Sequence, residues 1–283
     1  MGQHMARNLH KAGLLAAVWN RSIDKAQTLS SETGCILADD PAALGAAVDV
    51  VILCVSADAD VLNLVDALVT TARPGLIVID CSTVAATTAR EAAKRLATKG
   101  ADFLDCPVSG GVEGARDATL AIMCGGTAET FTRARPALEA LGRTITHMGP
   151  NGFGQATKAT NQILCAGVIQ AVSEAMAFAR AEGLPLDKVI ETLGKGAGSS
   201  WYFVNRAPFM ARGSYPAGFR VRLHDKDLGI CHDMAAARGV ELPLVETTRV
   251  QYRQLMATGH GDEDISTIVR LKDELFEKGA GRR

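Results

Sequence analysis

Short apolar runs alternate with helical patterns over the first 150 residues of this 283-residue chain. The runs are too short and too rich in β-branched residues for confident helices, so they predict buried strands. We expect strands at 14–19, 48–55, 76–80, 101–105, 120–124 and 144–148. The helical patterns lie at 3–12, 24–33, 60–71, 85–99 and 127–141. Strands that alternate with helices predict parallel βαβ units with right-handed crossovers.

The alternation stops near Gly149-Pro150-Asn151-Gly152, and no convincing strand pattern follows. Helical patterns continue instead, at 155–181, 186–193, 230–237, 243–257 and 265–278. The sequence therefore predicts an α/β domain over residues 1–150 and an all-helical domain over residues 151–283. A cleft between two such domains is the default place for an active site.

Composition and charge exclude several classes of protein. Hydrophobic residues make up 47% of the chain and charged residues 22%, which is ordinary for a globular protein. The 30 Lys and Arg against 31 Asp and Glu argue against a nucleic-acid partner. No apolar run approaches the ~18–20 residues that a membrane span needs, so we expect no membrane partner.

Cysteine and histidine spacing indicates the compartment and argues against a metal. The seven cysteines are scattered and form no CxxC pair. This usage is typical of a reducing cytoplasm rather than of a disulfide framework. The six histidines show no metal-ligand spacing, so we expect a cytoplasmic protein without a metal site.

The residues after the first predicted strand bear on cofactor choice. In a dinucleotide-binding fold, an acid about 20 residues past the glycine loop binds the ribose 2′-hydroxyl. Gly2 heads the first helix, and Asn20 and Arg21 stand where that acid is expected. An arginine can hold a 2′-phosphate that a carboxylate would repel, which favours NADP over NAD. The alternative interpretation is a solvated turn.

Ser109-Gly110-Gly111 follows the strand predicted at 101–105. A Ser-Gly-Gly segment after a strand exposes backbone N–H groups, and such nests bind anions, including carboxylates. It does not match the GxSxG elbow of hydrolases, because Val108 precedes the serine and no acid–histidine pair is placed to activate it. A bare tight turn is the alternative.

The long helical pattern begins with two glycines, Gly152 and Gly154, which allow another group to approach the backbone closely. Lys158, Asn161 and Gln162 are three and four residues apart and therefore share a helix face. Much of this helical pattern is apolar. A lysine within it lies either at the rim of the apolar surface or partly buried, as an amine suited to acid–base catalysis at neutral pH.

Seven segments in order along the chain carry a family resemblance: MGQHMARNLHKAG, VWNRS, CVS, DCSTV, DCPVSGG, GFGQATKATN and KDLG. Together they resemble the β-hydroxyacid dehydrogenase family over essentially the whole chain. That family includes 3-hydroxyisobutyrate dehydrogenase, tartronate semialdehyde reductase and glyoxylate/succinic semialdehyde reductase. The resemblance implies a Rossmann-type, doubly wound parallel sheet that binds NADP, followed by an all-α domain for substrate binding and dimerisation.

The resemblance also implies residue roles. Lys158 matches the catalytic lysine, which protonates the carbonyl oxygen in reduction or takes the hydroxyl proton in oxidation. The substrate-binding residues implied are Ser109, Gly110, Gly111 and Asn161. The cofactor-binding residues implied are Met1, Gly2, Asn20, Arg21, Ser22, Val55, Thr83 and Lys226.

The implied activity is that of an NADPH-dependent oxidoreductase. It would interconvert a small semialdehyde or 2-oxo acid and the corresponding hydroxy acid, with NADP preferred over NAD. The substrate would carry a carboxylate, and the chain would form a homodimer or homotetramer. Two alternatives stay open: an imine reductase, in which another residue typically replaces the lysine, and a non-catalytic nucleotide-binding scaffold.

One departure from the family concerns the beginning of the chain. The family usually begins with a strand and a GxGxxG loop, of which only the last glycine, Gly2, and the preceding Met1 remain here. About ten residues of the usual pattern are missing, including a strand inside the sheet. We therefore expect the working protein to begin upstream of Met1, and the neighbouring strands to lack a pairing partner.

Overall fold

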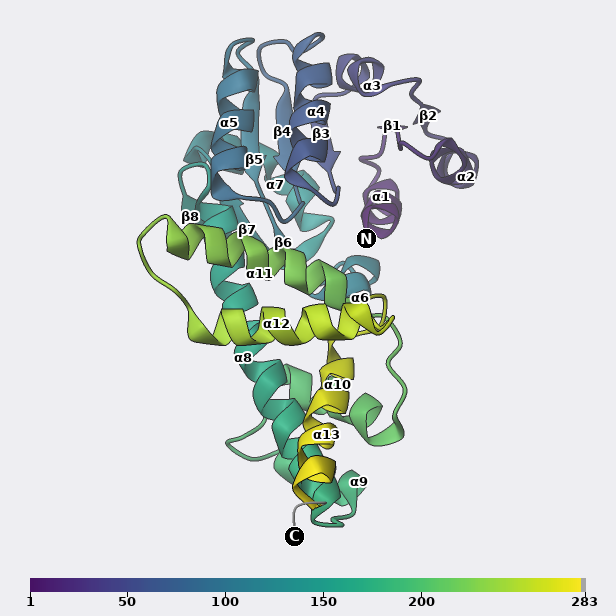
Figure 1. Ribbon diagram of the computed structural model, residues 1–283. Coiled ribbons are helices and arrows are strands. Elements are labelled where there is room, and N and C mark those ends of the chain that lie inside the picture. Colours follow the sequence, from purple (N-terminus) through teal and green to yellow (C-terminus); the bar gives the residue numbers. More distant parts are fainter. Residues whose placement is uncertain (281–283) are drawn as a thin grey trace. The chain divides into compact units, whose positions relative to one another are not determined.

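The computed structural model describes residues 1–280 (Figure 1). The chain divides into two compact units, Met1–Lys158 and Ala159–Arg283. This division lies within helix α8 (Phe153–Ala181), whereas the boundary predicted from sequence precedes that helix. The first turn of α8 belongs to the N-terminal unit because Asp105, at the end of a strand, accepts hydrogen bonds from its backbone.

The N-terminal unit is an α/β structure, and each strand and helix predicted there has a counterpart. Its helices are α1 (Gly2–Lys11), α2 (Ile23–Thr33), α3 (Pro41–Ala47), α4 (Asp58–Val69), α5 (Ala86–Ala97), α6 (Gly111–Arg116) and α7 (Ala128–Glu139). Its strands are β1 (Ala17–Val18), β2 (Ile36–Leu37), β3 (Val50–Leu53), β4 (Ile77–Asp80), β5 (Asp102–Asp105), β6 (Val108–Ser109), β7 (Leu120–Gly125) and β8 (Gly142–Gly149). The additional elements β2, α3, β6 and α6 are too short to produce a clear hydrophobic period.

Helices cover both faces of the main sheet, as a doubly wound fold requires. Ile77 and Ile79 of β4 pack into a core with α1 and α7, while Val78 between them packs into a second core with α4 and α5. In Figure 1, α4 and α5 lie in front of the strands and α7 lies behind them. Because successive side chains of a strand point to opposite faces, one buried strand serves both cores.

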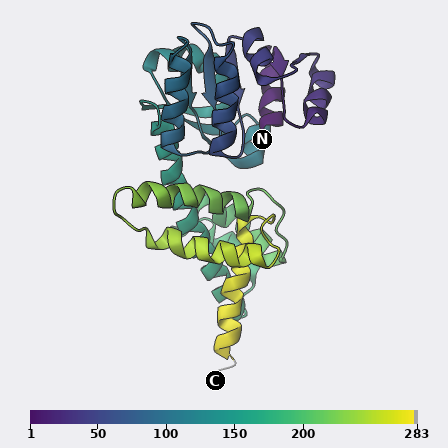
Figure 2. The ribbon, with the colours of Figure 1, turned by 45° about the horizontal axis from the view of Figure 1, so that its top comes forward.

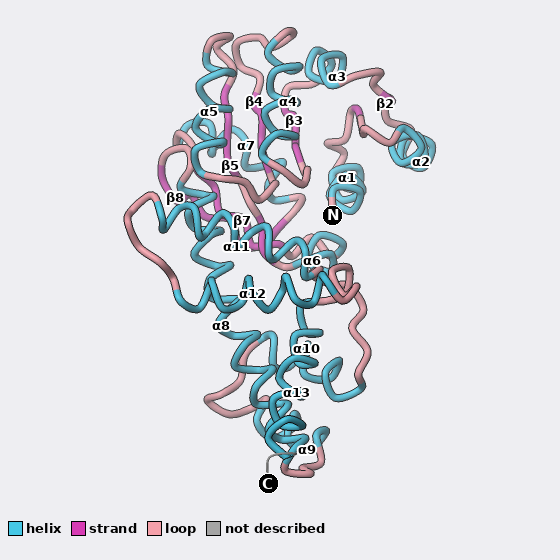
Figure 3. Tube along the Cα trace, viewed as in Figure 1, coloured by secondary structure: helices cyan, strands magenta, loops and turns pink. Residues whose placement is uncertain are grey.

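The main sheet has the order β3-β4-β5-β7-β6, with β8 paired to β7 (Figure 3, magenta). The pairs β3–β4, β4–β5 and β7–β8 are parallel, but β7 runs antiparallel to both β5 and β6. The main sheet is therefore mostly parallel, as predicted, and β7 is the exception. Only β6 and the six-residue helix α6 lie between β5 and β7. After β6 the chain turns through α6 and returns along β6 itself, so β7 runs antiparallel.

The first two strands form a small sheet of their own. β1 pairs in parallel with β2 through Ala17–Ile36 and Val18–Leu37, and neither belongs to the six-stranded sheet. Both Figure 1 and Figure 2 show this part, coloured purple, beside the β3 edge. Both β1 and β3 line a cavity of about 760 Å³. Within residues 1–280 each of these strands pairs on one side only.

The C-terminal unit is helical. After α8 it contains α9 (Leu186–Leu193), α10 (Trp201–Arg212), α11 (Val221–Ala236), α12 (Pro243–Ala257), a 3-10 turn η1 (Ile265–Ile268) and α13 (Val269–Ala280). Its core includes Ile169, Met176, Phe203, Leu228 and Tyr252. The prediction of an all-helical second half is confirmed for the described residues, which contain no named strand beyond β8.

Helix α8 is long and apolar enough to cross a membrane by length and composition alone, and it is the one such helix among residues 1–280. Polar residues interrupt the apolar run of α8, so its sequence shows no continuous apolar segment of that length. The mean hydropathy of its most apolar segment is 1.4, and half of that segment is buried inside the protein. Ile169 and Met176 of α8 belong to the helical core, which is how a core helix of a globular unit packs.

Candidate cofactor and substrate site

Most predicted site residues of the N-terminal unit follow the carboxyl ends of strands. Asn20 follows β1, Val55 follows β3 and Thr83 follows β4. In open α/β sheets, ligands bind in the crevice outside this edge. The structure brings the last two loops together, because the Val55 N–H donates to the Ser82 Oγ at 2.9 Å.

The N-terminus of α1 reaches this edge as well. Gly2 is the first residue of α1, and a side chain there would meet the β-carbon of Cys54 at 3.5 Å. The first turn contains no acidic residue. Unpaired backbone N–H groups and the helix dipole make such an N-terminus suitable for phosphate. Met1, Gly2, Asn20 and Val55 also line the cavity beside β3.

The predicted 2′-phosphate site forms a polar turn after β1. The Asn20 side-chain amide donates to the Ser22 carbonyl oxygen at 2.9 Å, which closes the turn. Arg21 extends from it with 86% of its side chain exposed, 3.4 Å from an Asp60 carboxylate oxygen in the first turn of α4. An exposed pair of this kind contributes little energy. The guanidinium can therefore exchange Asp60 for a phosphate.

The Ser-Gly-Gly segment joins β6 to α6. Ser109 ends β6, and Gly110 and Gly111 have φ angles of +129° and +67°, which other residues rarely adopt. A side chain on Gly110 would meet Leu120 Cδ2 at 3.3 Å, and one on Gly111 would meet Glu113 Oε2 at 3.0 Å. The segment is a tight turn that requires both glycines. A tight turn and an anion-binding nest, the two interpretations of this motif, do not exclude each other.

The first turn of α8 is fixed to strand ends. The carboxylate of Asp105, the last residue of β5, accepts the N–H groups of Gly152 at 2.8 Å and Gln155 at 3.0 Å. A side chain on Gly154 would lie 2.3 Å from the Asp105 carbonyl oxygen and 2.4 Å from that of Met123 in β7. Burial raises the pKa of Asp105, although these hydrogen bonds favour its charged form.

Lys158 lies one turn further along this anchored helix segment. Only 7% of its surface is exposed, so the rim placement considered from the sequence is wrong. Its position is set by a helix start that cannot shift without disrupting β5 and β7. A buried amine on a rigid element is the arrangement that general acid–base chemistry needs.

A second buried acid, Asp80, supports the loop after β4. Its Oδ1 accepts the Ser82 N–H at 2.9 Å, and its Oδ2 has no hydrogen-bond partner within the described part of the chain. Burial raises the pKa of Asp80 to about 7, and the nearby carboxylates of Asp105 and Asp58 act in the same direction. Asp80 and Asp105 face each other across the β4–β5 pair.

The supporting residues Asp80, Asp105 and Gln155 are not among the predicted site residues. The available signal was an aspartate at the last position of two adjacent buried strands, Ile77–Asp80 and Asp102–Asp105. A carboxylate at the end of a buried strand is costly unless a neighbouring element donates hydrogen bonds to it. The glycine-rich start of the next long helix is the donor in the case of Asp105.

In the C-terminal unit, Asn161 and Lys226 belong to one hydrogen-bonded chain. The Asn161 amide donates to Gln162 Oε1 at 2.9 Å, and Gln162 Nε2 donates to Asp227 Oδ2 at 2.6 Å. The Lys226 amine lies 2.9 Å from Asp227 Oδ1. The structure thus joins a predicted substrate residue to a predicted cofactor residue through Gln162 and Asp227.

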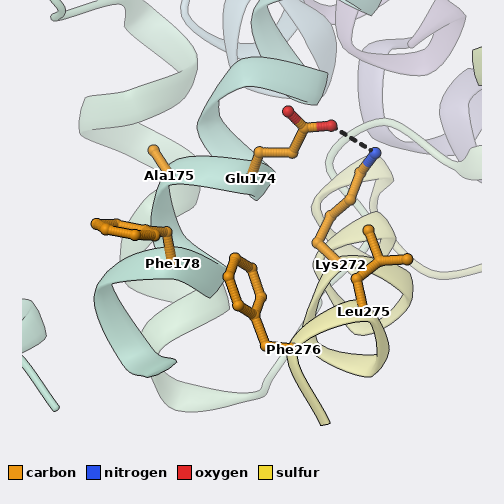
Figure 4. Close-up of a pocket in the computed structure, with 6 residues that line it drawn as sticks. All are labelled: Glu174, Ala175, Phe178, Lys272, Leu275 and Phe276. Atoms are coloured by element: carbon orange, nitrogen blue, oxygen red, sulfur yellow. Dashed lines mark hydrogen bonds and ion pairs between the residues drawn. The ribbon is translucent and has the colours of Figure 1, made fainter. Parts of the chain in front are cut away.

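Figure 4 shows a second cavity, of about 560 Å³, between α8 and α13 of the helical unit. Its wall is mostly apolar, and the rings of Phe178 and Phe276 meet edge to face with centroids 6.2 Å apart. At one end, the Lys272 amine donates to the Glu174 carboxylate at 3.0 Å. Phe178, Leu275 and Phe276 are all exposed, so this face is apolar toward solvent.

The seven cysteines of the chain are all free thiols. Over residues 1–280, no group of three His, Cys, Asp or Glu side chains is placed to hold a metal ion.

Family models match almost the whole chain. Residues 1–149 match the model described as the NAD binding domain of 6-phosphogluconate dehydrogenase. Residues 152–272 match the model described as the NAD-binding domain of NADP-dependent 3-hydroxyisobutyrate dehydrogenase. The two matches meet at the glycine-rich start of α8.

Curated proteins and solved structures are similar over nearly their full length. The chain is 38% identical to 3-hydroxyisobutyrate dehydrogenase of Pseudomonas aeruginosa, over 96% of this chain and 95% of that protein. It is 36% identical to the NAD-dependent L-serine dehydrogenase of the same organism, with the same coverage. A structure of Mycobacterium tuberculosis 3-hydroxyisobutyrate dehydrogenase with L-serine matches with a TM-score of 0.86 at 33% identity, covering 96% of this chain and 95% of that one.

Proposed function

The chain belongs to the β-hydroxyacid dehydrogenase family, and from this membership we propose that it reduces a small semialdehyde or 2-oxo acid with NADPH. The coarser activity, NAD(P)-dependent oxidoreduction of a hydroxy acid, is that of the family. The observation that carries the finer proposal is Lys158, a buried amine on a helix start fixed to the strand ends β5 and β7.

Residues of the N-terminal unit fit the cofactor. The first turn of α1 at Gly2 would bind the pyrophosphate, and Val55 and Thr83 would line the bound dinucleotide. Arg21 and Ser22 would bind the 2′-phosphate. When bound, the reduced nicotinamide supplies the hydride.

The substrate would be held by its carboxylate and protonated at its carbonyl oxygen. Ser109 and the N–H groups of Gly110 and Gly111 bind the carboxylate, and Asn161 holds the substrate further. The Lys158 ammonium stabilises the negative charge that develops on the carbonyl oxygen and then donates its proton there. In the oxidative direction the neutral amine accepts the hydroxyl proton.

A substrate panel tests this proposal. We expect oxidation of NADPH, followed by its absorbance, with glyoxylate, succinic semialdehyde or tartronate semialdehyde, and no turnover of a cyclic imine. Turnover of the imine alone would favour an imine reductase. No turnover together with no binding of NADPH would favour a non-catalytic scaffold.

Replacing Arg21 with alanine is expected to lower kcat/KM for NADPH by about tenfold to a hundredfold, because a charge-assisted hydrogen bond to the 2′-phosphate is lost. The value for NADH, which lacks that phosphate, should change little. Steady-state kinetics with both cofactors measure the ratio. Arg135→Ala is the matched control, since Arg135 is an exposed arginine paired with Glu139 on α7. Equal kcat/KM for the two cofactors in the wild type would contradict the preference for NADP.

We propose further that the helical unit mediates a homodimer or homotetramer. The apolar face around Phe178 and Leu275 supports this, since exposed apolar patches mark interaction sites. Leu275→Glu should shift the protein toward the monomer in sedimentation velocity experiments, because the charge would be buried on association. Glu277→Gln, an exposed change on the same helix, is the control. A monomeric wild type at micromolar concentration would refute this proposal.

A further inference from the structure

The buried side chain of Gln155 holds the main chain on both sides of Thr83. Its Nε2 donates to the Ser82 carbonyl oxygen at 2.8 Å, and its Oε1 accepts the Val84 N–H at 3.2 Å. A neighbouring strand would form the same pair of hydrogen bonds, one to a main-chain carbonyl and one from a main-chain N–H. Here the side-chain amide of Gln155 forms both. Only 1% of Gln155 is exposed, so water does not compete for either bond.

The segment that Gln155 holds is joined to another predicted cofactor loop. The Ser82 Oγ accepts the Val55 N–H at 2.9 Å, and the Ser82 N–H donates to Asp80 Oδ1 at 2.9 Å. The positions of Val55 and Thr83 are therefore linked through Ser82. Displacement of the Ser82 carbonyl would move both loops.

Gln155 also belongs to the helix that carries the predicted catalytic lysine. Its own N–H donates to the Asp105 carboxylate at 3.0 Å, and Lys158 follows three residues later in α8. Residues three apart lie on the same side of a helix. The main chain of Gln155 is thus bonded to the end of β5, and its side chain is bonded to the loop after β4.

We propose that Gln155 is a positioning residue that sets the distance between the Thr83 loop and Lys158, and so aligns cofactor and proton donor. This inference rests on the proposed function. It assigns Gln155 no contact with the reacting atoms. Displacements of about 1 Å at such sites lower the rate on the order of 10²-fold. We expect this effect when the side-chain hydrogen bonds of Gln155 to Ser82 and Val84 are lost.

The variant Gln155→Glu offers a test by pH. A protonated carboxyl group has one O–H donor and one carbonyl acceptor, so it can replace both amide bonds. The ionised group loses the donor and places a negative charge against the Ser82 carbonyl oxygen. Burial favours the neutral form of the introduced group, and the nearby carboxylates of Asp80 and Asp105 do the same. The Lys158 ammonium acts in the opposite direction, because a positive charge favours the ionised form of the introduced group.

We expect kcat/KM of Gln155→Glu to be close to that of the wild type at about pH 6 and to fall on the order of 10²-fold below it by about pH 9. The Kd for NADPH, measured by cofactor fluorescence, should rise over the same range, while circular dichroism stays unchanged. Gln170→Glu is the matched control: Gln170 is another buried glutamine of α8, bonded to Thr248 and Gln251. Its activity ratio to wild type should not depend on pH.

A ratio of Gln155→Glu to wild type that is constant with pH would overturn the proposal, whether it is near one or uniformly reduced. If this variant fails to fold, Gln155→Met replaces it, because methionine keeps the length and removes both bonds. The folded Gln155→Met protein should show a raised KM for NADPH and a lowered kcat. Unchanged values for both would overturn the proposal.

The outcomes separate this inference from the proposed function. If the wild type reduces no compound of the panel but binds NADPH, the proposed function fails, and the pH dependence of Kd still decides the role of Gln155. If the wild type is active and Gln155→Glu follows its pH profile, the inference alone fails. A wild type that binds neither NADPH nor NADH would overturn both.

Discussion

Replacement of Lys158 with alanine is expected to lower kcat for semialdehyde reduction by about 10²–10⁴-fold, the usual contribution of a positioned acid or base. The loss removes both the charge that stabilises the developing alkoxide and the proton that neutralises it. The affinity for NADPH should change only a few-fold, because the residues assigned to the cofactor lie in other loops. Stopped-flow reduction and fluorescence titration measure the two quantities separately.

Two further variants sharpen this test. Lys158→Arg keeps a positive charge but cannot release its proton near neutral pH, so it should be nearly as inactive as the alanine variant. Lys188→Ala removes an exposed lysine of α9 and should leave kcat unchanged. A near-native kcat in Lys158→Ala, in protein with native circular dichroism, would show that the mechanism proposed here is wrong.

Replacement of Gly154 with alanine is expected to lower the free energy of unfolding by about 3 kcal/mol, as overpacking of a rigid site does. Alanine normally stabilises a helix relative to glycine by up to about 1 kcal/mol, so helix propensity predicts the opposite sign. The new β-carbon would stand 2.3 Å from the Asp105 carbonyl oxygen and 2.4 Å from that of Met123. Both oxygens belong to strands of the main sheet and cannot move without breaking its pairing.

Urea unfolding followed by circular dichroism measures this change. Gly198→Ala is the control, because a β-carbon at Gly198 would meet no atom within 4 Å. Its free energy of unfolding should stay within about 0.5 kcal/mol of the wild type. A Gly154→Ala protein as stable as the wild type would mean that α8 can move away from β5 and β7, which would weaken the argument for Lys158 as well.

Long periodic segments could be predicted from the sequence because their pattern repeats often enough to be seen. Helix α8 was predicted at 155–181 and is observed at Phe153–Ala181. Helix α10 was missed because Pro208 and an aromatic cluster obscure its period. The first part of α11 lies outside the helix predicted at 230–237, because the charged segment from His224 to Asp227 is typical of a solvated helix start. The structure buries His224 and Asp227 instead.

Site residues could be predicted only where a local motif marks them, and their supports could not. The order of short motifs was enough to single out Lys158 and the Ser109–Gly111 turn. The bonds of Gln155 to Ser82 and Asp105 join residues 73 and 50 positions apart in the chain. Such contacts arise from the packing of strands β4 and β5 against α8. The local pattern marks the aspartate at the end of each strand but not its hydrogen-bond partner.

The separate sheet of β1 and β2 has a consequence for how the protein opens. We expect the amide protons of these two short strands to exchange with solvent through local opening. Those of β4, which is paired on both sides, should exchange only on cooperative unfolding. Asn20 and Arg21 follow a strand of the small sheet, and Val55 and Thr83 follow strands of the large one. A dinucleotide that contacts all four residues would connect two sheets of different rigidity. Part of its binding energy would then appear as slower hydrogen exchange in the first strands.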